Sequence, residues 1–178
     1  MNRLKTALII IVPLALLALV GWFVLFQQSS ADRVKQGADK YVQAILTKDF
    51  AGAVALTQQH LVDLSGGKAA MVSGLNGQEA KFRDQGVGYD TITLGDPQSP
   101  QKIGAWTLSL VPAQIVLKAP GGRLKADTFM LGMSDDDGKN WNYVSLSMTA
   151  DQFFQVYPEL KGKFAFPDKK APVVEKKQ

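Results

Sequence analysis

The sequence contains no cysteine and only one histidine, His60. Without cysteine, the chain can form no disulfide, no thiolate metal site and no lipid-modified cysteine of a lipoprotein. A single histidine likewise excludes a metal site built from several imidazoles. We therefore expect neither a resident metal nor a cofactor, and the lack of cysteine is compatible with an oxidising compartment.

Motifs of nucleophilic and phosphate chemistry are missing as well. Gly66-Gly67-Lys68-Ala69 lacks the upstream glycine and the following Ser or Thr of a phosphate-binding loop. His60 falls near the apolar face of a helical segment, where we expect a packed residue and not a catalytic base. No Ser/His/Asp arrangement can be specified from the spacing of these residues.

Charge is absent from residues 7–26, and this run is the most informative part of the chain. About 20 apolar residues are enough to cross a bilayer as a helix, and Pro13 and Gly21 are tolerated in such a helix. Arg3 and Lys5 precede the run and favour a cytoplasmic N-terminus. The sequence predicts a single pass through the cell inner membrane, with the C-terminal domain in the periplasm or outside the cell. The predicted parts are a cytoplasmic segment at 1–6, a transmembrane signal anchor at 7–26 and a linker at 27–31.

Cleavage of this segment as a signal peptide is the main alternative. Ser29-Ser30-Ala31 presents small residues in the arrangement that a signal peptidase reads, just before Asp32. The apolar run is longer than the roughly 7–15 residues of a signal peptide and stays bulky to its end. We therefore favour an uncleaved anchor over cleavage after Ala31. A buried helix of a soluble protein fits less well, because no charge interrupts the run.

The net charge of +4 is distributed unevenly along the chain. Residues 27–157 carry 12 cations and 13 anions, so the folded part is nearly neutral. Nucleic-acid binding needs a concentrated basic face, and we expect none here. Residues 169–178 are predicted to be a disordered basic tail, for which contact with anionic lipid or cell-wall polymer is an alternative role.

Helical periodicity dominates the first half of the domain. Apolar residues recur at helical spacing from Asp32 to about Thr47, and again from Phe50 to Leu64. Asp49 is a plausible N-cap for the second helix, which Ser65-Gly66-Gly67 should end, giving an antiparallel helical hairpin. Further along, we expect a turn at Leu75-Asn76-Gly77 and a short helix over 79–85 that stops at Gly86.

Strand patterns follow in the second half. We expect strands over 87–94, 105–118, 124–133 and 141–147, with hairpins at 119–122 and 135–140 and a loop at 95–100. Pro112 implies an edge or a bulge in the second of these strands. Thr149 to Gln152 reads as a capping box that starts a short C-terminal helix, stopped at Pro158.

Helices first and strands last predict one α+β domain over 32–168. The expected fold is a helical hairpin packed on one face of a curved antiparallel sheet, preceded by the transmembrane helix and followed by the short C-terminal helix. No internal repeat is present.

The phrase Ala38-x-x-Tyr41-x-x-Ala44-Ile45-x-x-Lys48-Asp49-Phe50-x-x-Ala53, followed by a meander, resembles a known family. It is similar to the opening of nuclear transport factor two-like domains of bacterial envelope proteins. The resemblance implies a cone, formed by a bent sheet around helices, whose mouth can hold a ligand. The family includes isomerases, dehydratases, binding modules and assembly subunits, so the fold alone selects no function.

Ser134-x-Asp136-x-Gly138-x-x-Trp141 resembles the Asp-box turn. Its acidic side chain can accept backbone N–H groups, glycine permits positive φ, and the aromatic ring covers the hairpin. The box is usually structural, and one copy indicates neither a propeller nor a glycosidase. The neighbouring aspartates also resemble half a calcium loop, but the distal Glu that such a loop requires is missing.

The candidate ligand-binding residues are Trp106, Tyr143, Asp127 and Asp90. Aromatic side chains can line a ligand mouth, and a desolvated carboxylate can reach a pKa that suits proton transfer. Asp127 shares parity with Phe129 and Leu131, which indicates a face of mixed polarity or an incorrect register.

The sequence favours a non-catalytic binding or assembly module of the bacterial cell envelope, acting on a small apolar ligand or an envelope protein. The alternatives are an isomerase- or hydratase-like enzyme that uses the cone cavity, and a structural subunit of an envelope complex.

Overall fold

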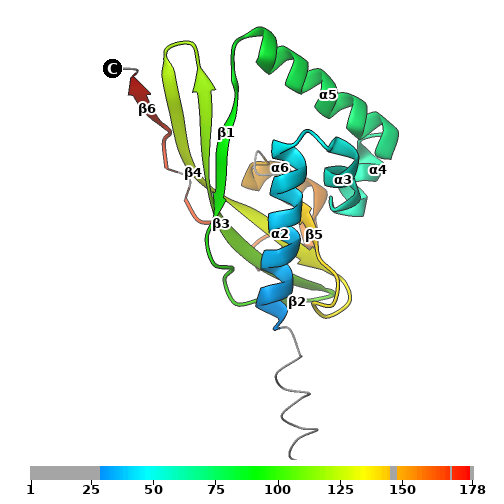
Figure 1. Cartoon of the computed structure of the whole chain (residues 1–178). Coiled ribbons are helices and arrows are strands. Elements are labelled where there is room, and N and C mark those ends of the chain that lie inside the picture. The colour runs from blue at the N-terminus through cyan, green and yellow to red at the C-terminus, as the bar shows by residue number, and fades with distance from the viewer. Residues whose placement is uncertain (1–28, 145–147, 169, 177–178) are drawn as a thin grey trace, which may run out of the picture.

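The computed structural model describes residues 29–144, 148–168 and 170–176. The predicted cytoplasmic segment and signal anchor lie outside this part. Among the described residues, no helix is both long enough and apolar enough to cross a membrane. The described chain forms an α+β fold in which a curled antiparallel sheet carries helices, as Figure 1 shows.

The sheet is built on a long hairpin of β3 (Trp106–Ala119) and β4 (Gly122–Ser134). At one end of the hairpin, β1 (Gly88–Leu94) pairs with β3 and β6 (Val173–Lys176) pairs with β4. At the other end, β2 (Gln101–Ile103) pairs with β3 and β5 (Asn142–Val144) pairs with β4. All of these pairs are antiparallel, as predicted, although β2 and β6 are additional strands.

Pro112 lies in β3 where neither β1 nor β2 pairs with it. The ladder with β1 ends at Ala113, and the ladder with β2 ends at Leu108. The Pro112 carbonyl points into this gap, where it accepts a hydrogen bond from the Gly95 N–H at 2.8 Å. Because N and C=O of one residue point to the same side in an antiparallel strand, the missing N–H of Pro112 interrupts no ladder. The proline thus occupies a local edge inside a central strand.

The first helix of the domain, α2 (Ser30–Leu46), begins and ends close to the predicted positions. The second predicted helix is divided into α3 (Phe50–Ala55), capped by Asp49 as expected, and α4 (Gln59–Leu64). The break has a tertiary cause. Tyr143 N–H donates to the Leu56 carbonyl at 2.8 Å, and Gln58 N–H donates to the Tyr143 carbonyl at 3.1 Å. Residues 56–58 therefore extend the sheet beside β5, and the Gln58 side chain caps α4.

A single helix, α5 (Lys68–Asp84), replaces the predicted turn and short helix. Asn76 lies within it, and its side-chain amide donates to the Val72 carbonyl one turn earlier, at 2.9 Å. Gly67 and Gly86 have positive φ and lie at the two ends of the helix. The sequence also predicted helix ends at these two glycines. In Figure 1, α5 extends from the start of β1 toward α4.

The sequence predicted helices on one face of the sheet only. In the structure, both faces are covered at the end of the sheet that carries β2 and β5. On one face, α2 and α3 pack with Val111, Met130 and Tyr143. On the other face lie α6 (Ala150–Val156), the 3₁₀ helix η1 (Pro158–Leu160) and Phe164. The capping box at Thr149 is present. Strand alternation explains the two cores, because neighbouring residues of β3 and β4 point to opposite faces.

The end of the chain differs in part from the expected disordered tail. Val173–Lys176 forms β6 on the edge of β4, opposite Gly122–Lys125. Val173 and Val174 are 61% and 65% exposed. The composition of the tail predicted that its side chains are solvated, and the exposure of the two valines agrees with that prediction. The composition did not predict the backbone pairing, which depends on the free edge of β4.

Candidate functional site

The Asp-box-like turn adopts the geometry that its sequence predicts. Asp136 Oδ1 accepts hydrogen bonds from the Asn140 N–H, the Lys139 N–H and the Ser134 hydroxyl, at 2.9, 3.1 and 2.8 Å. These bonds, chiefly the one from the Asn140 backbone, hold the pKa of Asp136 well below its usual range. The carboxylate is therefore saturated with donors, and it acts as a structural anion of the turn.

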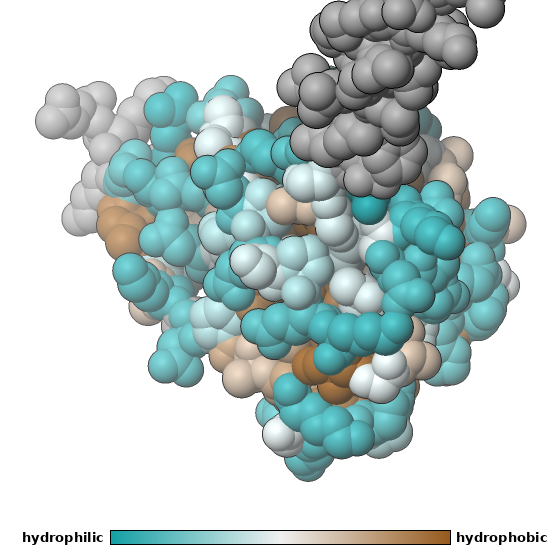
Figure 2. All heavy atoms as spheres, turned by 90° about the horizontal axis from the view of Figure 1, so that it is seen from below, coloured by the Kyte–Doolittle hydropathy of each residue, from teal (hydrophilic) through white to brown (hydrophobic). Residues whose placement is uncertain are grey.

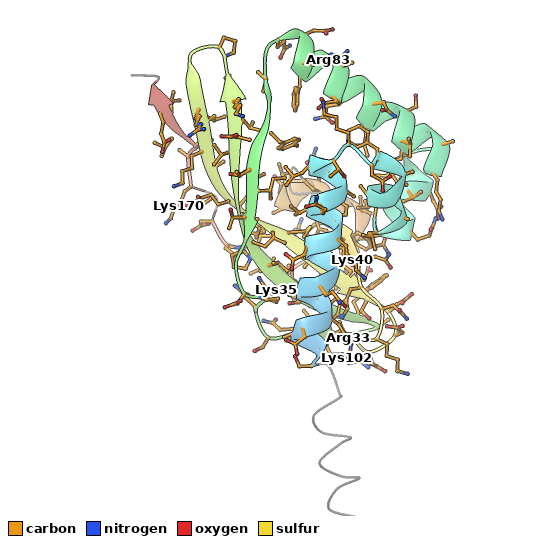
Figure 3. All side chains as sticks on the ribbon, viewed as in Figure 1. Arg33, Lys35, Lys40, Arg83, Lys102 and Lys170 are labelled. Carbon is orange, nitrogen blue, oxygen red and sulfur yellow. The ribbon has the colours of Figure 1, made fainter. Side chains whose placement is uncertain are left out.

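This turn is also tied to the start of α2. Arg33 Nε donates to the Gly138 carbonyl at 3.0 Å, and the Trp141 indole donates to the same oxygen at 3.1 Å. A Cβ at Gly138 would lie only 2.6 Å from Ser30 Oγ, and φ at this glycine is +79°. The positive φ and the close approach of Ser30 both require glycine. Figure 3 shows Arg33 and Lys102 at this end of the molecule, where Lys102 pairs with Asp137.

The start of α2 has a complete capping box. Asp32 N–H donates to Ser29 Oγ at 3.0 Å, and Ser29 N–H donates to Asp32 Oδ2 at 3.1 Å. Ser30 Oγ is buried and has no hydrogen-bond partner among the described residues. The surface around this end is mainly hydrophilic in Figure 2. Ser29 and Ser30 are thus part of the folded domain.

The interior of the predicted cone is filled by aromatic and aliphatic side chains. Tyr143 is fully buried, and its hydroxyl donates to the Val34 carbonyl at 2.7 Å. Burial raises the pKa of Tyr143, and it raises the pKa of Tyr41, 6.0 Å away between ring centroids, to about 12. Tyr143 was predicted as a ligand-binding residue. It lies in the core with no exposed surface, and its hydroxyl is committed to the backbone of α2.

Asp90 lies at a register shift in β1, where Lys118 and Arg123 hold its carboxylate at 2.8 and 3.0 Å. The hydrogen bond from Lys118 is the main cause that lowers the pKa of Asp90. Because general-base catalysis near neutral pH needs a raised carboxylate pKa, the shift has the wrong direction for that role.

Asp127 is exposed and accepts a hydrogen bond from the Gln114 side chain at 2.8 Å. The structure explains its mixed parity. Phe129 stacks on Phe166, and Leu131 belongs to the core beneath α6, whereas Asp127 lies farther along the same face of β4. It borders a hollow of about 230 Å³ that is also lined by Pro167, Asp168 and Lys170. Of the two alternatives, the structure supports a face of mixed polarity, which helices cover only in part.

Trp106 is half-buried at the start of β3. Its indole N–H donates to Glu159 at 3.2 Å, and its ring meets the Tyr157 ring edge-on at 5.8 Å. His60, which was expected to be packed, is exposed, and its ring meets the Tyr157 ring edge-on at 5.9 Å between centroids. Trp106, Tyr143, Asp127 and Asp90 therefore lie in four different surroundings, each with its own partners.

Two hollows beside α5 were not predicted, because the helix itself was not. One of about 40 Å³ lies between Phe50, Glu79 and Tyr89, and it is only large enough for water. Here burial and the nearby Glu79 raise the pKa of Tyr89. The other hollow, of about 560 Å³, lies between α3 and α5.

A comparison of the sequence with models of known protein families finds no match, and a comparison with curated proteins finds none either. The curled antiparallel sheet with its helices is compatible with a cone-like α+β fold. Membership of the nuclear transport factor two-like family stays a prediction.

Proposed function

We propose that this chain is a membrane-anchored, extracytoplasmic module of the bacterial cell envelope that acts by binding and not by catalysis. The observation that carries the proposal is the filled interior of the sheet. Tyr143, Tyr41 and Trp141 pack together in the core, where the resemblance to a cone fold would imply a ligand cavity. The carboxylates proposed for proton transfer lie elsewhere, at Asp90 and Asp127.

The start of α2 supports an uncleaved anchor. Cleavage after Ala31 would remove the N-cap Ser29 and the Ser30 side chain that packs on Gly138. It would also place a positive α-amino group at the N-terminus of α2, where the helix dipole disfavours positive charge. Because the domain uses residues that cleavage would remove, we infer that the apolar run at 7–26 stays attached.

A structural subunit is the second candidate, and β6 favours it. Its pairing within the described residues is with β4 alone, and Val173 and Val174 are exposed on it. An apolar outer strand with an available edge is a place where a partner protein can add a strand.

Native mass spectrometry of the full chain, extracted in mild detergent and pulled down, tests the proposal. A retained small molecule supports a binding module, and a stoichiometric neighbour lost in a Val174→Lys variant supports the subunit. A turnover that disappears in Asp90→Asn or Asp127→Asn would overturn the non-catalytic assignment.

A further inference from the structure

The hollow between α3 and α5 has a volume of about 560 Å³ and opens to solvent. This volume lies within the range of pockets that hold small organic ligands. Its apolar lining comes from Ala51 and Val54 on α3 and from Ala69 and Val72 on α5. Small side chains on both walls keep the space open.

The helix that forms one wall is weakly attached. None of the 17 residues of α5 is buried, and none belongs to either hydrophobic core. Gly66 and Gly67 precede it and Gly86 follows it, all at positive φ. Because no side chain of α5 is buried, α5 can move outward at a lower free energy than unfolding of the whole domain requires.

Charge distinguishes one end of the hollow. Lys68 lines it at the first turn of α5, and among the described ion pairs none involves Lys68. From Lys68 to Asn76, which lines the other end, the helix rises by about 12 Å. The hollow thus runs along α5, is mainly apolar, and has a cation at one end.

We propose that the hollow between α3 and α5 binds a single-chain amphiphile with an anionic head, such as a fatty acid. The acyl chain lies between Val54 and Val72, and the carboxylate faces the ammonium group of Lys68. The inference rests on the proposed function as a binding module and specifies its ligand class.

Photo-crosslinking tests the assignment on the full chain in membranes. A dodecanoate analogue carrying a diazirine on its chain is expected to label peptides that contain residues 51–54 and 69–72. Unlabelled dodecanoate should compete more strongly than dodecylamine does, because the head group of dodecylamine has the same sign as Lys68. Competition by a lysophospholipid of equal chain length would indicate that the site takes a phospholipid head. Lack of competition would indicate a free carboxylate.

Variants make the test specific to the hollow. Lys68→Glu should lower labelling by about fivefold, the change expected from losing one exposed ion pair, whereas Lys81→Glu in the last turn of α5 should not. Ala69→Trp, which fills the hollow, should abolish labelling, and its neighbour Ala70→Trp should not.

Equal labelling of wild type, Lys68→Glu and Ala69→Trp, or labelling confined to other segments, would overturn the amphiphile site. The proposed function would survive that result if native mass spectrometry still finds another bound molecule or a stoichiometric neighbour. The two failures are therefore distinguishable.

Discussion

Tyr143 connects the parts of the domain at the scale of single residues. Its hydroxyl binds the Val34 carbonyl of α2, and its backbone pairs with residues 56 and 58, which separate α3 from α4. Gly37 lies directly against it, because a Cβ at this position would come within 2.3 Å of the Tyr143 hydroxyl oxygen. The glycine is thus required by packing, although it weakens the helix.

Gly37→Ala should destabilise the domain by about 2 kcal/mol, measured by urea unfolding. Alanine gains about 1 kcal/mol of helix propensity, but the added methyl displaces a buried and hydrogen-bonded tyrosine. Gly77→Ala in α5 is the control, since its Cβ meets nothing within 4 Å. It should stabilise α5 by up to about 1 kcal/mol. Equal effects of the two substitutions would contradict this account of the packing.

Asp136 makes stability depend on pH. Its pKa is lower in the folded chain than the value of about 3.9 of an unfolded aspartate. The stabilising contribution is therefore full above that unfolded pKa and is lost as the pH falls toward the folded pKa. The thermal midpoint of the wild type should fall on acidification below about pH 5.

Asp136→Asn tests the origin of that fall. The variant should show a smaller decrease of the midpoint on acidification, because it lacks the titrating carboxylate. Asp135→Asn, an exposed neighbour in the same turn, should behave as the wild type does. A wild-type pH profile in Asp136→Asn would show that the turn does not depend on this charge.

At the scale of elements, α2 and α5 form a natural pair for comparison. Both have 17 residues, yet α2 buries five of them and α5 buries none. An element held by few buried contacts opens locally at a lower free energy than the whole domain unfolds. The difference between the two helices is therefore a difference in local stability.

Hydrogen exchange should show amide protection in α5 at least about tenfold lower than in α2, which corresponds to the burial of roughly one apolar side chain. Gly74→Ala should raise the protection of α5, because helix propensity improves and its Cβ has open space. Protection of α5 equal to that of α2 would disprove the weak attachment on which the ligand hollow depends.

Elements with local signals were predictable from the sequence, and elements set by distant contacts were not. Three features were predicted because their hydrogen bonds join residues three or four positions apart: the Asp49 cap, the Thr149 capping box and the Asp-box turn. The break between α3 and α4 depends on Tyr143, far away in the sequence. Asn76-Gly77 is typical of a turn, but the fold places it inside α5.

The candidate site was harder to predict than the fold. Trp106, Tyr143, Asp127 and Asp90 were chosen by residue type and strand parity, and tertiary structure gave each of them a different partner. The hollow beside Lys68 depends on α5, whose apolar face is too weakly patterned to predict a continuous helix. The residues that line this hollow on α3 and α5 form no recognisable sequence motif.

At the scale of the whole molecule, α2 connects the fold to the rest of the chain. Only Gln27 and Gln28 separate the apolar run from the N-cap Ser29. The three residue steps from the end of the run to Ser29 span at most about 10 Å. In the proposed arrangement, the end with Arg33, Lys102 and the Asp-box turn faces the bilayer, and the rest of the domain faces away from it.

The intact mass of the protein from fractionated cells, combined with protease added outside the inner membrane, tests this arrangement most directly. We predict a membrane-bound chain of full length, still carrying residues 1–31, whose domain is digested by the external protease. A chain that begins at Asp32, or a full-length chain free in the cytosol and protected from the protease, would contradict the account.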